Sequence, residues 1–569
     1  IISLLFLFIC FSLNVLVSAQ TDAYDIIISE IMYANEPPNV AFEFMNAYEF
    51  IEFKNLEDRD IDLSGWTVGG LGYTFPPGAT IKAKGFHVLA RVPSKFEEFY
   101  KVKADNTQQI TAKLSNRGER ITLRNGTRPV GLTPEEEMRN DVISISYDTA
   151  LPWPEMADNR GFSLVPINPN EYFDHDDPYN WRASSKRNGS PGRDDPPSTV
   201  PQLLINEILT NPNAENNEVD FVELYNPNNF EVKLDHWCLT DILSNITQFQ
   251  FPVGTGSIAA NGYRTVPVTE FKFGLSAKGD DKIFIVSHDG NEPTGWAHGF
   301  SFSAAPRGIP FGRFVNGVNR ELFVLLKEPT PGKANADPIP PIVYIAEIDY
   351  NPLTGVGMEC TSDLQCEFIR IQNSLKAEVN LFDQDLDGTP WRIGGLNFTL
   401  PRGVILPADG VAYITPADPA KFKQIKRLPD ETLVFGPAEG TLSNNGETLT
   451  IYRPLPKDAT DLIYPYAIVD RVKYSDDAPW PEVADGSGKT LHRCDPTLIG
   501  DDASNWGTMP ECVRKTVMPT PAVRPTSPPI STTPPAMEAS VDGLSLSVIL
   551  AIFGGVLLFL ILVVVGVVI

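Results

Sequence analysis

The 569-residue sequence is poor in cysteine, histidine and positive charge, and each shortage narrows what the protein can do. It has 6 Cys and 6 His, and none of them has the spacing of a zinc site. Lys and Arg number 46 against 72 Asp and Glu, which gives a formal charge of −26. A protein that binds a polyanion needs a basic footprint, so we expect no nucleic acid among its partners.

Long helical patterns are also missing, because the apolar runs are short, rich in Val, Ile, Phe and Tyr, and broken by 50 Pro and 42 Gly. Such runs predict all-β units. In the first 150 residues we expect strands at Ile26–Met32, Phe50–Asn55, Gly65–Val68, Ala79–Ile81, Phe86–Arg91, Arg120–Leu123 and Val142–Tyr147. About seven short strands favour a two-sheet sandwich of the immunoglobulin type, with a barrel as the alternative. Helix is expected only in short pieces, Pro93–Tyr100 and Pro419–Arg427.

What the sequence does contain is the same pattern three times. A strand-like run ends in Glu-Ile at Glu30-Ile31, Glu207-Ile208 and Glu347-Ile348, and a second run then ends in Asn55, Asn226 or Asn373. Two further pieces recur: Leu114-Ser115-Asn116-Arg117-Gly118-Glu119 matches Leu442-Ser443-Asn444-Asn445-Gly446-Glu447, and Trp153-Pro154-Glu155 matches Trp480-Pro481-Glu482. Internal repeats of this kind fix the architecture. They predict three domains, 24–193, 202–336 and 342–512 (repeats one, two and three), joined by stiff Pro-rich linkers.

The two ends predict export and membrane attachment. Residues 1–19 have an apolar run and a small-residue cleavage site at Val17-Ser18-Ala19, as in a signal peptide. Residues 513–543 are rich in Pro, Thr and Ser and predict a stalk without a core. Residues 544–569 are long and apolar enough for a single-pass membrane helix. A glycolipid-anchor signal with Ser540 as the attachment point is the alternative, and both place the bulk of the chain outside the cell.

The three repeats resemble the lamin tail domain, an immunoglobulin-like β-sandwich of nuclear lamins and of many secreted or surface proteins. The resemblance rests on the Glu-Ile strand, the Asn-ending strand, the Asp62-Leu63-Ser64-Gly65-Trp66 turn and the Pro329-Thr330-Pro331-Gly332 ending. It implies three tandem sandwiches. The nuclear role of lamins does not carry over, because there is a secretory signal and no heptad rod. Repeat three departs from the pattern, with Arg370 where the others have Glu52 and Glu223.

In an oxidising compartment we expect the disulfides Cys360–Cys366 and Cys494–Cys512, and a buried free thiol at Cys238. Four triplets fit the N-glycosylation signal: Asn125, Asn245, Asn397 and Asn188, the last with Pro191 next door. The tryptophans Trp66, Trp237 and Trp391 share one repeat position, and we expect them in the core rather than on a carbohydrate-binding surface.

Two candidate sites carry chemistry. Asp383, Asp385 and Asp387 precede Gly388, as in the first half of a calcium loop, but Gly394 stands where the bidentate Glu of an EF-hand would be. The alternative is a solvated acidic turn. Glu30 and Glu52 form a carboxyl pair that could do acid–base work, although Arg370 replaces the second carboxyl in repeat three.

No other motif of catalysis, such as a nucleophile elbow or a phosphate-cradling loop, is present. We therefore expect a non-enzymatic cell-surface protein whose repeats bind an extracellular protein or glycan, without a cofactor unless the calcium loop is real. The alternatives are a secreted or anchored hydrolase with a site between repeats, and a structural wall or matrix component.

Overall fold

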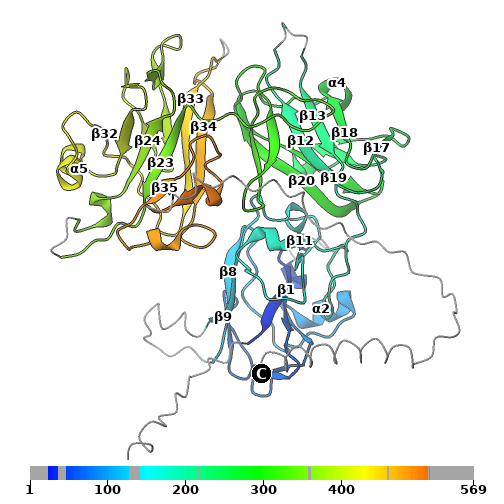
Figure 1. Cartoon of the computed structure of the whole chain (residues 1–569). Helices are drawn as coiled ribbons and strands as arrows, with labels where there is room; N and C mark the ends of the chain where they lie inside the picture. Colours follow the sequence, from blue (N-terminus) through cyan, green and yellow to red (C-terminus); the bar gives the residue numbers. More distant parts are fainter. Residues whose placement is uncertain are drawn as a thin grey trace, which may run out of the picture. The chain divides into compact units, whose positions relative to one another are not determined.

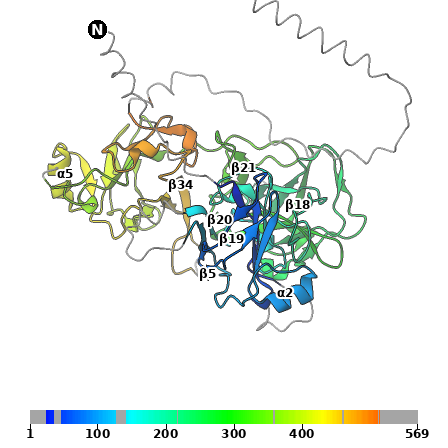
Figure 2. The same ribbon diagram turned by 90° about the horizontal axis from the view of Figure 1, so that it is seen from below.

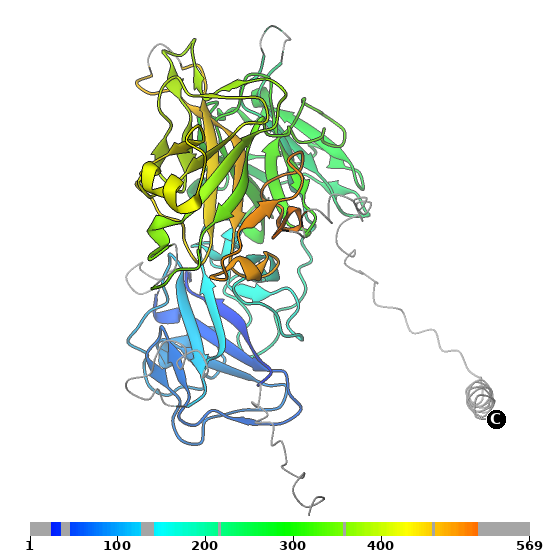
Figure 3. The same cartoon turned by 60° about the vertical axis from the view of Figure 1, so that its left-hand side comes forward.

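The computed structural model describes residues 24–35, 46–126, 141–213, 215, 218–356, 360–457, 461–509 and 512. The predicted signal peptide, stalk and membrane segment lie outside these residues. No helix within the described part of the chain is long and apolar enough to cross a membrane. Figure 1 labels the elements, and Figures 2 and 3 give two further views of them.

Repeat one folds into two facing antiparallel sheets. The first sheet has the order β11-β10-β1-β2-β7, the second β5-β4-β8-β9, and a small ribbon pairs β3 with β6. The strands are β1 (Ile26–Met32), β2 (Phe50–Asn55), β3 (Ile61–Asp62), β4 (Thr67–Gly69), β5 (Tyr73–Thr74), β6 (Thr80–Ile81), β7 (Phe86–Ala90), β8 (Glu119–Arg124), β9 (Asp141–Tyr147), β10 (Leu164–Pro166) and β11 (Trp181–Ala183).

Repeat two has the same topology. Its first sheet runs β18-β13-β12-β21-β22, its second β16-β15-β19-β20, and its ribbon is β14-β17. The strands are β12 (Leu204–Leu209), β13 (Phe221–Tyr225), β14 (Val232–Lys233), β15 (Cys238–Thr240), β16 (Phe249–Gln250), β17 (Ser257–Ile258), β18 (Tyr263–Pro267), β19 (Gly279–His288), β20 (Pro293–Ser303), β21 (Phe311–Val315) and β22 (Glu321–Leu325).

Repeat three keeps this order and adds strands. Its first sheet is β32-β31-β24-β23-β35-β36, its second β29-β28-β33-β34, and two ribbons pair β25 with β30 and β26 with β27. The strands are β23 (Val343–Asp349), β24 (Phe368–Asn373), β25 (Val379–Asn380), β26 (Phe382–Asp383), β27 (Thr389–Pro390), β28 (Arg392–Gly394), β29 (Phe398–Thr399), β30 (Ile405–Leu406), β31 (Val411–Ile414), β32 (Leu433–Phe435), β33 (Glu447–Pro454), β34 (Tyr466–Tyr474), β35 (Leu491–Arg493) and β36 (Trp506–Gly507).

Each repeat has its own apolar core between its two sheets. In repeat one Ile28 and Phe53 from the first sheet meet Ile121 and Ile145 from the second, and repeats two and three bury equivalent clusters. The all-β prediction is therefore confirmed, and the two-layer packing is that of a sandwich rather than of a closed barrel. Trp66, Trp237 and Trp391 belong to these cores, with at most 5% of each side chain exposed.

Short helices cover the outer face of a first sheet. In repeat one α2 (Pro93–Tyr100; labelled in Figure 2) lies next to β7 and places Phe96 on Phe50 of β2, with the ring centroids 5.4 Å apart. In repeat three α5 (Pro419–Lys426) lies beside β32 (Figure 1) and places Phe422 on Phe368. Repeat two has the shorter α4 (Val268–Phe271). Both predicted helices are confirmed.

The asparagine at the end of the second strand (Asn55, Asn373) or directly after it (Asn226) is fully buried in each repeat and braces the ribbon that follows. In repeat two Asn226 Nδ2 donates to the carbonyl oxygens of Phe230, Ile258 and Ala259 at 2.8, 2.9 and 3.0 Å, while Oδ1 accepts from Asn228 N at 2.9 Å. Asn55 and Asn373 make the corresponding bonds in their own repeats. The repeated asparagine of the sequence is thus a structural brace, because it satisfies buried backbone groups that the ladder leaves unpaired.

Candidate functional site: paired carboxyl groups beneath the closing segments

The two glutamates noted in the sequence become cross-strand neighbours. In repeat one Glu30 of β1 is the Cα partner of Glu52 of β2, and the register shifts between Ile28 and Glu30. The same shift brings Glu207 opposite Glu223 in repeat two and Glu347 opposite Arg370 in repeat three. Such a β-bulge inserts one residue and re-aims the side chains beside it.

The pair in repeat one lies beneath the closing segment, residues 184–195, which follows β11. Ser190 N donates to Glu30 Oε1 at 2.9 Å, and Gly192 N donates to Glu52 Oε2. Two hydroxyl groups complete the site: Ser163 Oγ donates to Glu30 Oε1 at 2.5 Å, and Ser29 Oγ, from the bulge itself, donates to Glu52 Oε1 at 2.7 Å. Both carboxyl groups are consequently buried, with exposures of 1% and 0%.

The closing segment needs glycine where it approaches the pair. Gly189 has a φ of +78°, and a Cβ at this position would lie 1.9 Å from Glu30 Oε1. Gly192 has a φ of +83°, a conformation that L-residues with side chains rarely adopt. A side chain at Gly189 would therefore displace the segment from the sheet.

Repeat two builds the same site with different side chains. Thr330 N donates to Glu207 Oε1 at 2.8 Å, Thr330 Oγ1 also donates to Glu207, and Gly332 N donates to Glu223 Oε2. The bulge residue Asn206 takes the part of Ser29 and donates to Glu223 Oε1 at 2.9 Å. The closing segment here is residues 326–335, after β22, and its Thr330-Pro331-Gly332 is the counterpart of Ser190-Pro191-Gly192.

Repeat three has neither a second glutamate nor a Pro-Gly closing segment. Arg370 Nε donates to Glu347 Oε2 at 2.7 Å, and these two side chains keep 18% and 15% of their surface exposed. Thr490 Oγ1 donates to the other oxygen of Glu347 at 2.8 Å. The chain after β36 is instead tied by a disulfide, Cys494–Cys512. A guanidinium and a covalent bond thus replace the backbone donors of the first two repeats.

Burial raises the pKa of all four paired carboxyl groups in repeats one and two. It raises the pKa of Glu52 to about 8 and that of Glu30 well above its usual range, where the neighbouring Glu52 adds to the effect. Burial likewise raises the pKa values of Glu207 and Glu223. Taking a carboxylate out of water disfavours its charged form, and the surrounding N–H and O–H donors offset this only in part.

The β-bulge leaves one backbone N–H of the first strand without a partner in the strand ladder, and in each repeat a side chain accepts a hydrogen bond from it. Ile28 N donates to His175 Nε2 at 3.1 Å, so Nδ1 carries the proton and donates to Phe173 O at 2.9 Å. Burial lowers the pKa of His175 to about 3, which keeps this imidazole neutral. Ile205 N uses His298 Nδ1 at 2.9 Å, and Ile345 N uses Asp470 Oδ2 at 2.8 Å.

Acid–base catalysis finds no support in this geometry. A catalytic carboxyl must reach a substrate atom, whereas Glu30 and Glu52 are covered by the protein's own backbone. The six histidines likewise form no metal site, because no cluster of three or more His, Cys, Asp or Glu in the described residues is arranged to hold a metal ion.

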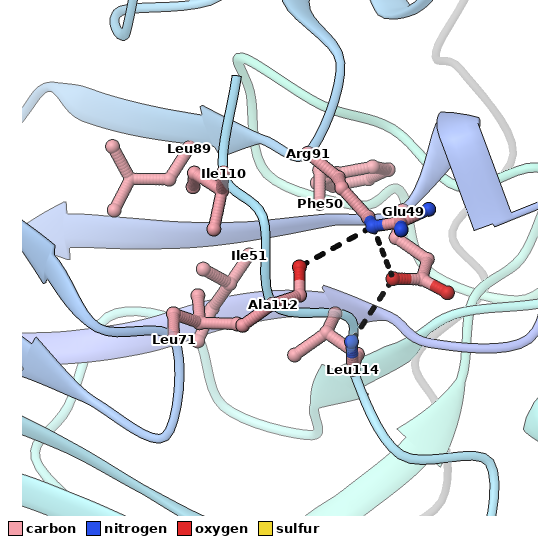
Figure 4. A pocket seen from close by; sticks show the side chains of 9 residues that line it. All are labelled: Glu49, Phe50, Ile51, Leu71, Leu89, Arg91, Ile110, Ala112 and Leu114. Atoms are coloured by element: carbon pink, nitrogen blue, oxygen red, sulfur yellow. Dashed lines mark hydrogen bonds and ion pairs between the residues drawn. The ribbon is translucent and has the colours of Figure 1, made fainter. Parts of the chain in front are cut away.

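A cavity in repeat one lies beside another buried carboxyl, Glu49 (Figure 4). Glu49 Oε2 accepts from Leu114 N at 2.9 Å, Arg91 Nε donates to Ala112 O at 3.3 Å, and the remaining walls are apolar. Its empty volume is about 190 Å³ with open solvent included, less than the roughly 300–1,000 Å³ of ordinary ligand sites. In repeat three Glu367 holds Leu442 N in the same way at 3.0 Å, so this carboxyl positions a turn.

The cysteines pair as the sequence predicts. Cys360 is bonded to Cys366, with Cα atoms 6.0 Å apart, and Cys494 to Cys512, with Cα atoms 4.7 Å apart. Cys238 is free and buried in β15. Burial raises the pKa of its thiol to about 11, which makes it a poor nucleophile.

The three aspartates proposed for calcium do not converge. Asp383 Oδ1 accepts from Asp385 N at 3.0 Å within the turn, whereas Asp387 Oδ2 accepts from Tyr464 Oη at 2.9 Å. Asp387 has a φ of +58° and is followed by Gly388 at +64°. The sharp turn is therefore present, but its carboxylates serve hydrogen bonds of the protein.

The glycosylation triplets differ in accessibility. Asn125, Asn245 and Asn397 are exposed, and Asn397 Nδ2 donates to Glu439 Oε2 at 2.5 Å. Asn188 belongs to the closing segment of repeat one: its Oδ1 is buried without a hydrogen-bond partner, and Ser190 of its triplet is 1% exposed. The folded chain thus offers three of the four sites.

Several residues of the site were not predicted from the sequence. Ser163, Ser190 and Gly192, with Thr330 and Gly332 in repeat two, supply the donors to the carboxyl pairs. The residues of the closing segments could have been found in the sequence, because a Ser/Thr-Pro-Gly triplet follows the last strand in both repeats. His175 and His298 carried no such signal, since they sit at unrelated distances from their bulges.

The fold and the repeated site define a class of protein, a tandem array of two-layered β-sandwiches. Residues 19–135 and 196–297 match the family model of the Lamin Tail Domain. The first two repeats of this chain therefore match the lamin tail domain, which confirms the resemblance for them; the match does not include repeat three.

No curated protein matches the chain. Among solved structures, the crystal structure of a DUF4876 family protein from Bacteroides thetaiotaomicron is 12% identical, with 47% of this chain and 86% of that chain covered. Its TM-score of 0.17 is too low to carry an argument.

Proposed function

We propose that this chain is a non-enzymatic cell-surface protein whose three lamin-tail-like sandwiches bind an extracellular protein or a glycan. The observation that carries the proposal is the burial of the carboxyl pairs. In repeats one and two the paired carboxyl groups, which could have supplied acid–base chemistry, hold the closing segment instead, and the outer polar surface is left for recognition. Repeat three joins the proposal because its strand order, its bulge and its buried asparagine are those of repeats one and two.

The external location rests on the cysteines and the exposed glycosylation triplets. Disulfides persist in oxidising compartments, and two of them form here. Together with the signal-like residues 1–19, the Pro/Thr-rich residues 513–543 and the apolar residues 544–569, they favour an exported chain held at the membrane. A membrane span is preferred to a glycolipid anchor, and nucleic acid is not among the proposed partners because of the charge of −26.

Surface exposure and binding are tested in one experiment. The full chain is tagged internally at the exposed 125–126 turn and expressed in secretory cells, and reagents added to intact cells should biotinylate it. Beads coated with the chain should aggregate with one another or with beads coated with extracellular matrix. Phospholipase that cleaves glycolipid anchors should not release it. Recovery of the chain only from a soluble nuclear extract would refute the proposal.

The alternatives give different results in the same preparation. A hydrolase would turn over at least one member of a peptide, ester and glycoside panel and lose this activity in Glu30→Gln. A structural wall or matrix component would resist detergent extraction. Calcium at the Asp383–Asp387 turn is not part of this proposal, because no three carboxylates among the described residues are arranged to hold a metal ion. Calorimetry with calcium should give equal heats for the full chain and for Asp385→Ala, and binding that Asp385→Ala abolishes would restore the calcium loop.

A further inference from the structure

The carboxyl pair of repeat one lies in surroundings with an excess of negative charge. Three more carboxylates face it, Asp105 from the loop after α2 and Asp194 and Asp195 from the closing segment, and Tyr100 of α2 faces Glu30. Two cations are near. Lys54 Nζ is bound to Asp194 Oδ1 at 2.6 Å, and Arg182 to Asp195 Oδ2 at 2.6 Å. The two cations are thus each matched by an aspartate, and neither neutralises the pair.

The groups that touch the pair are all neutral donors. Glu30 accepts from Ser163 and Ser190, and Glu52 from Ser29 and Gly192. Among the described residues no lysine, arginine or histidine forms an ion pair with either glutamate. Two full negative charges on directly opposed residues, buried without a counter-ion, would repel each other strongly.

We propose that each of the two carboxyl pairs, Glu30–Glu52 and Glu207–Glu223, is a proton-binding site that latches the closing segment of its repeat. With one proton on the pair, a single negative charge remains and the backbone N–H groups of the Pro-Gly segment hold it. When that proton leaves to solvent, the two carboxylates repel each other, water enters, and the closing segment lifts from the sheet. No covalent bond changes in this step.

The direction of the pH dependence follows from linkage. Burial raises the pKa of Glu52 to about 8 in the closed state, whereas a carboxyl exposed by opening returns to its ordinary value of about 4.3. The closed state therefore keeps a proton that the open state has lost between these two values. The contribution of this proton to the stability of the closed state is therefore fully present below the pKa of the open state and decreases as the pH rises toward 8.

The three repeats provide internal comparisons. Repeat two has the same carboxyl pair, with Lys333 of its own closing segment and Tyr263 of β18 as the charged and titratable groups that face it. Its latch should respond in the same direction. Repeat three has the Arg370–Glu347 ion pair and the Cys494–Cys512 disulfide, so its end should not respond.

Opening has a consequence for the linkers. The closing segments run directly into the Pro-rich stretches 194–201 and 337–341 that separate the repeats. A released segment lengthens the chain between neighbouring repeats, at up to about 3.5 Å per residue. Proton binding thus sets how much flexible chain separates neighbouring repeats, a property independent of which ligand they bind.

Amide hydrogen exchange on the full chain, read by mass spectrometry and corrected for intrinsic rates with unstructured peptides, tests the latch. Protection of residues 184–195 should fall by up to about tenfold per pH unit, the limit for one proton, between pH 5 and 8 and level off above that. Protection of residues 326–335 should fall in the same direction as the pH rises, because burial also raises the pKa values of Glu207 and Glu223. Glu52→Gln should remove this dependence from repeat one and leave repeat two unchanged. Glu49→Gln, a matched buried carboxyl away from the latch, should leave both dependences intact.

Flat protection of both closing segments from pH 5 to 9 in the wild-type chain would overturn the proposal, as would an unaltered pH dependence in Glu52→Gln. Difference infrared spectroscopy of the wild-type chain gives a second reading that does not need a folded variant. Between pH 6 and 9 the carbonyl stretch of protonated carboxylic acids should disappear. Glu49, Glu155 and Glu367 contribute to this band, because burial raises their pKa values as well, so the decisive result is the absence of the band. If no such band is present at pH 6, the pair holds no proton and the proposal is wrong.

Discussion

Arg370 donates from Nε to Oε2 of Glu347 across 2.7 Å, at the position where the first two repeats place a second glutamate. Repeat three lacks the Pro-Gly closing segment and has an arginine in place of the second glutamate. The two differences are related, because Glu347 needs another hydrogen-bond donor where the backbone donors of a closing segment are absent. The departure of repeat three from the sequence pattern at Arg370 is therefore a compensation inside the fold.

Arg370→Glu should destabilise repeat three. It would place two carboxylates opposite each other with no closing segment to hold them, at a cost of about 1–3 kcal/mol for a lost donor and an unpaired, partly buried charge. Hydrogen exchange of β23 and β24 in the full chain measures it. Lys376→Glu makes the same charge change on a side chain that is 85% exposed and should leave exchange in these strands unchanged; equal effects of the two would contradict the ion-pair argument.

Asn226→Asp should weaken repeat two by about 3 kcal/mol, because a carboxylate cannot donate to the carbonyl oxygens of Phe230, Ile258 and Ala259 and would repel them. Denaturant titration monitored by hydrogen exchange in β14 and β17 gives the value. The nearby Asn229→Asp, the same change at an exposed position, serves as the control. A variant as stable as the wild type would show that the asparagine brace does not stabilise the ribbon.

The thiol of Cys238 should stay unmodified in the folded chain. With its pKa raised to about 11, only about one molecule in a thousand carries the thiolate at pH 8, and the buried sulfur is closed to reagents. In the chain from which residues 1–19, and with them Cys10, have been removed, a maleimide should label one cysteine in denaturant without reductant, and none before unfolding. Rapid labelling of the native chain would show that Cys238 is accessible after all.

Glycan occupancy should follow accessibility. In a eukaryotic secretory host Asn125, Asn245 and Asn397 should carry glycans, and Asn188 should not, because Pro191 follows its triplet and a glycan there would obstruct the closing segment. Glycopeptide mass spectrometry before and after glycosidase treatment gives the occupancy of each site. A fully occupied Asn188 in a folded chain would contradict the placement of residues 184–195 over the sheet.

Much of the fold could be read from local patterns. Strands β1 and β2 and helix α2 have the predicted bounds, because the short apolar runs of the strands and the helix-starting Pro93 are local signals. Strands β10 and β11 were missed. Each has only three residues, too few for a period, and they are strands only because β1 lies beside them.

The sequence alone determined the all-β class, the three repeats, the core tryptophans and the local cysteine pairs, since each depends on residues near one another in the chain or on a repeated spacing. The tertiary structure decided what the paired glutamates do. Glu30 and Ser190 are separated by 160 positions, and only the packing of the last segment on the first strand turns two solvated-looking acids into a buried, proton-holding pair. Burial and opposed charge are properties of that packing, and a linear pattern does not record them.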